Sequence, residues 1–247
     1  MKGAVTTNRL SQLWALVAER AWPRGASVSL EDICGVCAAE IPSDGVSLTA
    51  NTSPQDLVER LCATTPLARE IEELQATLGQ GPGVAALSCD GPVLTPDLHD
   101  ATPRRRWPAF APAAVQAGLG AVFVFPLRTG AVQVGALSLH RAGPKPLTDA
   151  QLSDALSLAD MALEIMLDGG ADTCVEDRPL WNGFAAFHDQ AEVHQAAGMI
   201  SAQLDVGIDE ALVRLRAYAF GHERPLADVA RDVVRRRLKF TPDPQTD

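Results

Sequence analysis

The sequence predicts an α+β protein in which an antiparallel sheet flanked by helices is followed by a small, all-helical bundle of three helices. Two observations lead to this class. In the first two thirds of the chain, helical periods alternate with short apolar strands, two of which are joined by a tight turn at Arg128–Gly130. In residues 187–242, apolar side chains recur only at three- and four-residue steps, which is the period of helices.

Length and composition fit this organisation. The chain has 247 residues, which is enough for two cores. No apolar run reaches the roughly 18 residues that a membrane-spanning helix needs, and the first twenty residues lack the apolar stretch of a signal peptide. We therefore expect a cytoplasmic protein whose five cysteines are reduced.

Charge is spread unevenly along the chain. The formal net charge is −10, which argues against the whole chain wrapping nucleic acid. Residues 231–239, however, carry five basic side chains and one acidic one. Any contact with nucleic acid is therefore expected to be local, near the C-terminus.

The elements of the first part follow from periodicity and breakers. Apolar period and capping residues predict helices at Leu10–Trp22, after the N-cap Ser29 through Glu40, at Leu67–Leu78, within Thr102–Pro112 and at Thr148–Leu167. A helix or a bend is expected over Gly83–Leu87. Short apolar runs predict four strands, at Val46–Ala50, Val93–Thr95, Ala121–Leu127 and Val132–His140.

This part of the chain, residues 8–170, resembles a GAF domain. The resemblance rests on GQGPGVAA (Gly79–Ala86), PVLTPDL (Pro92–Leu98), RWPAFAPAAVQAGLGAVFVFPL (Arg106–Leu127), VGALSLHRAGPKPLTDAQL (Val134–Leu152) and LADMALEIML (Leu158–Leu167). It implies a domain for sensing or dimerisation, which would receive an unknown small-molecule ligand, a partner protein or only its own dimer mate. The related domains usually read GEGPC in the first segment, where this chain has Gln80 and Gly83, so an inherited ligand preference does not carry over.

Residues 171–186 have no clear period and are rich in acidic and small side chains, which predicts a linker. The block that follows, 187–242, resembles an ANTAR domain. The motifs are AAGMI (Ala196–Ile200), EALVRLRAYAF (Glu210–Phe220) and PLADVARDVV (Pro225–Val234). The resemblance implies binding to RNA hairpins in nascent transcripts, prevention of a terminator, and action as a homodimer. So small a bundle is marginal alone and would gain from docking on the first domain or from dimerisation.

The helical period also predicts which side chains of this block face outward. Gln195 and Gly198 lie opposite the apolar stripe of the first helix, and Arg216 and Phe220 lie opposite that of the second. An aromatic beside an arginine suits stacking on an unpaired base, although Phe220 could instead pack on a neighbouring segment. The predicted RNA-binding residues are Gln195, Gly198, Arg214, Arg216, Tyr218, Phe220, Arg231, Arg235, Arg236 and Lys239.

Two alternatives concern particular groups of these residues. The small-residue strip around Gly198 fits packing against another helix as well as close approach of an RNA backbone. Arg231, Arg235 and Lys239 are expected to form one exposed line at i, i+4 and i+8 for phosphates, but Asp228 and Asp232 are near enough to pair with it.

Enzymatic chemistry finds little support. Cys34 and Cys37 form a CxxC inside an amphipathic helix, but no second pair completes a zinc site, so we interpret both as core residues. The five histidines are scattered, and GQGPG lacks the lysine of a nucleotide-binding loop. We expect no catalysis, no cofactor and no metal. Two further hypotheses remain: a DNA-binding regulator that uses the three helices as a helix-turn-helix, and a signalling platform whose tail binds a protein.

Overall fold

The computed structural model describes residues 2–25, 27–51, 58–89, 91–130, 132–171 and 184–241. Its elements are, in chain order, α1 (Lys2–Ala21), η1 (Trp22–Arg24), α2 (Leu30–Glu40), β1 (Gly45–Asn51), β2 (Val58–Ala63), α3 (Pro66–Leu78), α4 (Pro82–Ala86), β3 (Val93–Thr95), α5 (Ala101–Arg106), α6 (Phe110–Gln116), β4 (Ala121–Thr129), β5 (Val132–Arg141), α7 (Asp149–Ala171), α8 (Phe184–Leu204), α9 (Ile208–Gly221) and α10 (Leu226–Val234). The predicted linker, 171–186, falls mostly outside the described residues.

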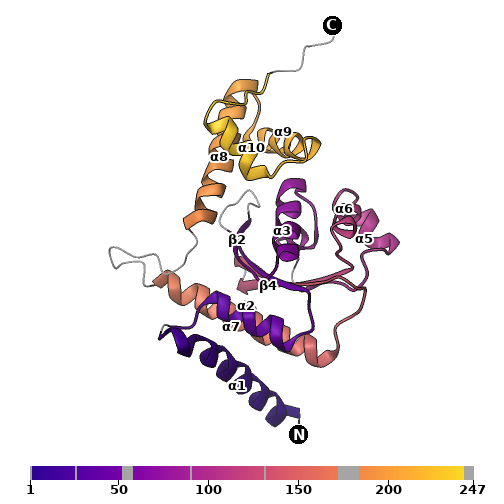
Figure 1. Cartoon of the computed structure of the whole chain (residues 1–247), viewed down its shortest axis with the longest axis vertical. Helices are drawn as coiled ribbons and strands as arrows, with labels where there is room; N and C mark the ends of the chain where they lie inside the picture. The colour runs from indigo at the N-terminus through magenta and orange to yellow at the C-terminus, as the bar shows by residue number, and fades with distance from the viewer. Residues whose placement is uncertain are drawn as a thin grey trace.

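The first domain is built on one antiparallel sheet with the strand order β2-β1-β5-β4-β3. Successive residues of β4 alternate between its two faces. Phe123 packs into the core beneath α1, α2 and α7, whereas Val122 and Val124 pack into the core beneath α3, α4 and α6. Figure 1 shows the resulting layers, with α2 and α7 on one side of the sheet and α3, α5 and α6 on the other. This confirms the predicted α+β class with flanking helices.

Local sequence determines the start of α2. Ser29 caps the helix as predicted, because its side chain accepts a hydrogen bond from the Asp32 N–H while the Asp32 carboxylate accepts one from the Ser29 N–H at 2.9 Å. Arg24 pairs with the same carboxylate. The helix thus begins at a capping box that is closed by a cation from the preceding turn.

Two expectations about this domain were wrong in extent. The sheet has a fifth strand, β2, on its edge, where the sequence VERLCA carries charges and no clear alternation. Its register against β1 also shifts between Leu48 and Thr49, which removes the simple period of two. In addition, α1 begins at Lys2 rather than Leu10, because polar residues extend the helix before its apolar stripe begins.

The C-terminal helices form a separate core, as predicted. The buried side chains are Val193, Ala196, Ala197 and Ile200 of α8, Ala211, Leu212, Leu215 and Ala219 of α9, and Leu226, Val229, Ala230 and Val233 of α10. Leu204, Tyr218 and Val234, also expected in the stripes, are half-buried against them. Periodicity therefore identified both the helices and the faces that they bury.

This bundle lies against the first domain. Helix α9 contacts α3, and α8 contacts the edge strand β2; Figure 1 shows the yellow bundle next to the exposed end of α3. The small helical domain thus docks on the sheet domain. Among the described helices, none is both long and apolar enough to cross a membrane.

Candidate nucleic-acid interface

The outward face of α8 is open. Gln195 is exposed, and a Cβ added at Gly198 would meet no heavy atom within 4 Å. Gly198 therefore does not serve close packing of another described helix. Of the two interpretations of the small strip, the structure leaves room for an external backbone at this position.

Helix α9 presents apolar side chains away from its core. Val213 and Phe220 are 61% and 51% exposed, and both lie opposite the buried stripe. Arg214 is half-buried and pairs with Glu210 at 2.9 Å, one helical turn earlier. Phe220 is therefore available for stacking, while part of the Arg214 charge is already balanced within the helix.

Arg216 is held by the other domain. Its Nε donates a hydrogen bond to the backbone oxygen of Ala76, 3.1 Å away in the last turn of α3. Its Nη1 lies 3.0 Å from the position that a Cβ on Gly79 would occupy. A cation at the C-terminus of a helix is favoured by the unsatisfied carbonyls and the negative end of the helix dipole. A predicted RNA-binding residue is thus engaged by the sheet domain.

Tyr218 lies in a small aromatic cluster. Its ring stacks on His222 with centroids 3.8 Å apart and meets Phe240 edge-on at 5.4 Å. The ring is half-buried against the core of the bundle, which agrees with its predicted place at the edge of that core. The cluster ties the chain after α10 to the end of α9.

The predicted line of three cations is wrong. Helix α10 ends at Val234 with Arg235 as its C-cap, and Arg236 adopts a left-handed conformation with φ 58°. Lys239 therefore does not continue the helical face. Arg231 is also paired, with Glu192 at 3.1 Å and Asp228 at 2.7 Å. These contacts favour a structural role for Arg231 within the bundle.

The exposed cations lie instead on the turn after α10. Arg235, Arg236 and Lys239 are all exposed, and no ion pair with a described carboxylate is formed by any of them. Two arginines that the sequence did not single out shape this turn. Arg224 and Arg237 both bind the Asp232 carboxylate, at 2.6 and 2.8 Å, and the hydrogen bond from Arg224 is the main cause that lowers the pKa of Asp232. Their role depends on the fold of the turn, which the helical period does not convey.

A small group of buried polar side chains lies behind α3, beside the hydrophobic core. The Glu72 carboxylate accepts hydrogen bonds from Ser47 Oγ at 2.6 Å and from the Gln75 amide at 3.2 Å. Burial is the main cause that raises the pKa of Glu72. Gln75 Oε1 accepts in turn from the Gly83 N–H at 2.6 Å. A Cβ at Gly83 would lie 2.9 Å from Gln75 Oε1, so a larger residue at 83 would displace the Gln75 amide from this arrangement.

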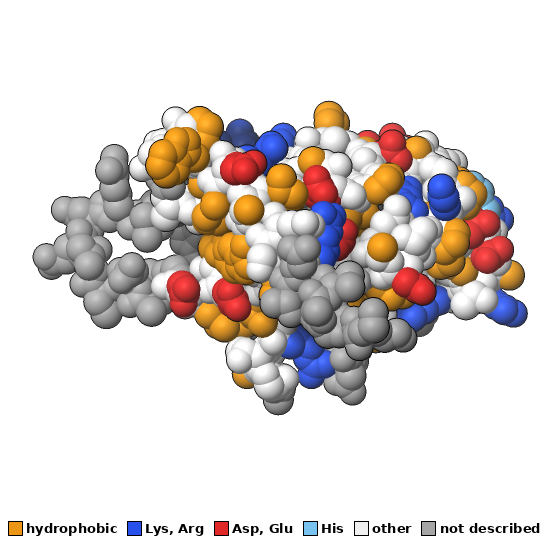
Figure 2. Space-filling view, turned by 90° about the horizontal axis from the view of Figure 1, so that it is seen from below, with side chains coloured by type: hydrophobic (Ala, Val, Ile, Leu, Met, Phe, Trp, Pro, Cys, Tyr) orange, Lys and Arg blue, Asp and Glu red, His pale blue; other side chains and the backbone are white. Residues whose placement is uncertain are grey.

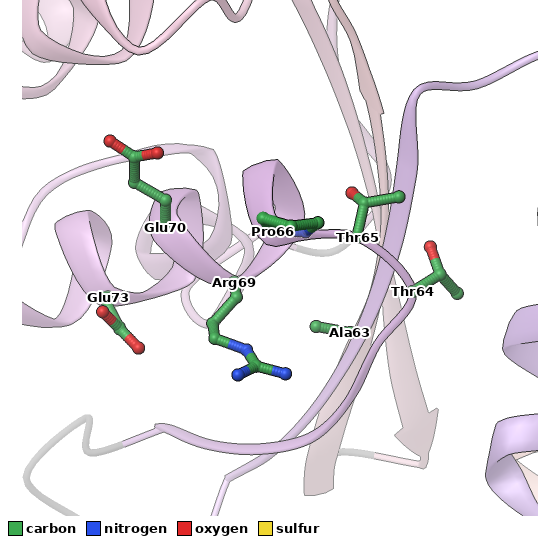
Figure 3. Close-up of a pocket in the computed structure, with 7 residues that line it drawn as sticks. All are labelled: Ala63, Thr64, Thr65, Pro66, Arg69, Glu70 and Glu73. Carbon is green, nitrogen blue, oxygen red and sulfur yellow. The ribbon is translucent and has the colours of Figure 1, made fainter.

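A surface pocket of about 280 Å³ opens where β2 meets α3. Figure 3 shows Arg69 and Glu73 extending to one side of α3, with Glu70 on the other. Glu73 also pairs with Arg60 at 3.2 Å. The mixed charges of this pocket do not select an anionic or a cationic ligand. Among the described residues, no group of three potential ligands is placed to hold a metal ion.

Comparisons with known proteins identify both parts. Residues 185–234 match the ANTAR domain family. The fold also matches a GAF domain from a phosphoenolpyruvate-protein phosphotransferase of Coxiella burnetii at 12% identity, covering 67% of this chain and 99% of that one with a TM-score of 0.51. No curated protein matches the sequence.

Other solved structures are similar at lower scores. The GAF domain of an Acinetobacter phosphoenolpyruvate-protein phosphotransferase is 12% identical over 69% of this chain and 98% of that one, with a TM-score of 0.49. A free methionine-R-sulfoxide reductase of Neisseria meningitidis is 18% identical over 71% and 95%, with a TM-score of 0.44. The first part of the chain thus has a GAF-like fold, and residues 185–234 match the ANTAR domain family.

Proposed function

We propose that this protein is a transcription antitermination regulator that acts in the cytoplasm. Residues 187–242 bind hairpins in nascent RNA, and residues 8–170 control that binding in response to a small-molecule signal. The observation that carries the proposal is the ANTAR match at residues 185–234. The exposed side chains near it supply the two kinds of contact that RNA recognition uses, namely cations for phosphates and an aromatic ring for unpaired bases.

The contact surface runs over three places on the bundle. Gln195 and Gly198 offer an open strip on α8, and Phe220 offers a half-exposed ring on α9. Arg235, Arg236 and Lys239 supply exposed charge after α10, and none of the three pairs with a carboxylate of the described residues. Arg214, Tyr218 and Arg231 flank this surface and orient it, because each is held by neighbours within the bundle.

The position of Arg216 supports the proposal that the first domain controls RNA binding. Its hydrogen bond to Ala76 places an RNA-binding candidate against the sensor domain, directly before the loop that starts at Gly79. Gln75 links the same turn of α3 to that loop through Gly83. A signal that moves the loop would therefore change how firmly α9 is held, and with it the access of RNA to Arg216.

A homodimer would present two such surfaces to paired hairpins, and the second contact would then be effectively intramolecular. We place the dimer surface on α1, the adjoining turn η1 and α7, which have exposed apolar side chains. Leu10, Trp22, Leu156 and Leu167 are 41%, 85%, 41% and 44% exposed. Figure 2 shows the molecule from the α1 end, where hydrophobic side chains lie open among charged ones. Measurement of the mass in solution for wild type and Trp22→Glu tests this part.

The function is tested first by sequencing RNA crosslinked to the protein in cells. We expect enrichment of transcript leaders with adjacent stem-loops. Competition between a recovered hairpin and duplex DNA of the same sequence, at fixed salt, then separates the alternatives. Preference for the duplex would favour a DNA-binding regulator and would contradict the proposed binding to RNA hairpins.

A charge-reversal variant locates the surface. Arg235→Glu, Arg236→Glu and Lys239→Glu together should weaken hairpin binding by more than tenfold, since three phosphate contacts are replaced by repulsion. The matched control reverses Arg104, Arg105 and Lys145, three exposed cations of the first domain. Equal loss in both variants would mean a general charge effect, and unchanged binding in the first would favour a protein partner for the tail.

A further inference from the structure

The turn after α10, Arg235–Lys239, has the backbone hydrogen bonds of a Schellman motif, a common way of ending a helix. The Arg236 N–H donates to the Val233 oxygen at 2.9 Å, and the Arg237 N–H donates to the Asp232 oxygen at 2.8 Å. Arg236 has φ 58°, in the left-handed region that glycine usually fills at this position of the motif. The turn is thus closed by its backbone, but it carries an arginine where a side chain is disfavoured.

The side chain of Asp232 holds the same turn. A Schellman motif is often completed by an apolar contact between the residue after the left-handed one and the residue whose oxygen it bonds. Here these residues are Arg237 and Asp232, and an ion pair of 2.8 Å takes the place of the apolar contact. The same carboxylate binds Arg224, which precedes α10, at 2.6 Å. Asp232 therefore ties the segments before and after α10 to one carboxylate.

The far end of the turn is anchored in the bundle. Leu238 and Phe240 are half-buried against its core, and the Phe240 N–H donates to Gln203 Oε1 of α8 at 2.9 Å. The cations between Asp232 and Phe240 that we place in the contact surface are exposed, namely Arg235, Arg236 and Lys239. The chain thus fixes where these cations are attached while their side chains stay open to solvent.

We propose that Asp232 is a positioning residue for RNA binding, which holds the turn in one conformation before the RNA arrives. The inference rests on the proposed function, because it concerns the same contact surface. Without the carboxylate, the left-handed Arg236 loses a restraint and the turn can relax to other conformations. Only part of the protein then presents its cations in the binding arrangement, and the apparent affinity falls by that fraction.

Electrostatics alone predicts the opposite effect. Asp232→Asn removes a negative charge beside the cations and releases Arg224 and Arg237 from their ion pairs. If charge alone mattered, RNA would bind more tightly and with a steeper dependence on salt. Loss of positioning instead weakens binding and makes the salt dependence shallower, because fewer phosphates are contacted at once. The sign of the change therefore separates the two explanations.

The test compares Asp232→Asn with Asp228→Asn in the full-length protein. Asp228 lies about one helical turn earlier and carries the same charge, but its carboxylate pairs with Arg231 and not with the turn. A labelled hairpin recovered by crosslinking is titrated at several salt concentrations. We expect Asp232→Asn to raise the Kd by about threefold or more and to lower the slope of log Kd against log salt. Asp228→Asn should not weaken binding, and Asp232→Glu, which keeps the carboxylate, should restore most of the affinity.

Hydrogen exchange of the free protein reports on the turn without RNA. The amides of Arg237 and Leu238 both donate to the Asp232 oxygen, at 2.8 and 3.1 Å. Both should exchange faster in Asp232→Asn than in wild type, and in Asp228→Asn they should exchange as in wild type. A thermal melt of each variant checks that the bundle stays folded.

Several results would overturn the proposal. Equal or tighter hairpin binding by Asp232→Asn, or unchanged exchange of the two amides, would remove the positioning role and leave the proposed function in place. A raised Kd at an unchanged salt slope would have the same meaning, because general unfolding of the bundle lowers the amount of binding protein without changing the contacts that it makes. A wild-type protein that binds no hairpin would instead refute the proposed function, and this role with it.

Discussion

The contact between Arg216 and α3 predicts that a change on the first domain tightens the proposed binding to RNA. The chosen change is Gly79→Asn. Gly79 is the C-cap of α3 with φ 61°, a left-handed conformation that asparagine tolerates better than most residues. Its new Cβ would lie 3.0 Å from Arg216 Nη1, and further side-chain atoms would displace the guanidinium.

The magnitude follows from the hydrogen bond that is lost. Hydrogen bonds to charged groups contribute about 1.5–3 kcal/mol, and the half-buried position of Arg216 places it at the lower end. A loss of about 1.5 kcal/mol from the docked state corresponds to about tenfold. If docking and RNA compete for α9, the apparent Kd for a hairpin should fall by up to that factor.

The assay is fluorescence anisotropy with a labelled hairpin recovered from crosslinking, at fixed salt. Gly25→Asn is the matched control, because Gly25 has φ 59° and an added Cβ there meets nothing within 4 Å. Hydrogen exchange of α9 should also rise in Gly79→Asn alone. If α9 exchanges faster in Gly79→Asn but both variants bind the hairpin like wild type, the release of Arg216 has no effect on RNA binding. That result would refute the proposed regulation by the first domain.

Three further predictions concern stability and pH. Gly198→Ala should raise the melting temperature, because alanine is favoured in a helix by about 1 kcal/mol and the position is open. The same change should weaken hairpin binding. Unchanged affinity would mean that Gly198 is not part of the contact surface. Ile200→Ala should destabilise the bundle by about 2–5 kcal/mol because the side chain is fully buried; Val213→Ala, at an exposed position, is the control in the same thermal melt. Burial raises the pKa of Glu59 to about 7 from its usual value of about 4.5. The folded state therefore holds a proton that the unfolded state loses, and this side chain makes stability fall as the pH rises from about 4.5 to 7. Glu59→Gln should therefore raise the melting temperature at pH 8 more than at pH 5, and an equal shift at both would contradict the assignment.

Periodicity predicted the helical bundle because each stripe is apolar and continuous. The α10 stripe, for example, runs from Leu226 to Val233 without a charged interruption, and its members are buried as expected. Strand β2 was not predicted from periodicity. Glu59 is buried there, and among the described residues its carboxyl oxygens have no hydrogen-bond partner, which is an uncommon position for a charged residue. Strand β2 forms because it pairs at the edge of the sheet, with a register shift against β1. Both features depend on tertiary contacts, which the local sequence does not show.

The candidate site was predictable in composition but only partly in geometry. Phe220 faces outward because helical spacing alone decides its direction. The prediction of a cationic line was wrong because α10 ends at Val234. The sequence does not announce this end, since neither glycine nor proline follows within the next six residues. The engagement of Arg216 depends on a carbonyl 140 residues away in sequence. No local pattern carries that information.

Tyr218 gives this protein a built-in spectroscopic label. It is the only tyrosine in the chain, and its ring lies between His222 and Phe240 at the margin of the proposed contact surface. Biosynthetic replacement by fluorotyrosine would therefore yield a single fluorine resonance without any engineered tag. Because ring stacking strongly affects chemical shift, that resonance would follow hairpin binding and release from α3 in one sample, and could order these two events in time.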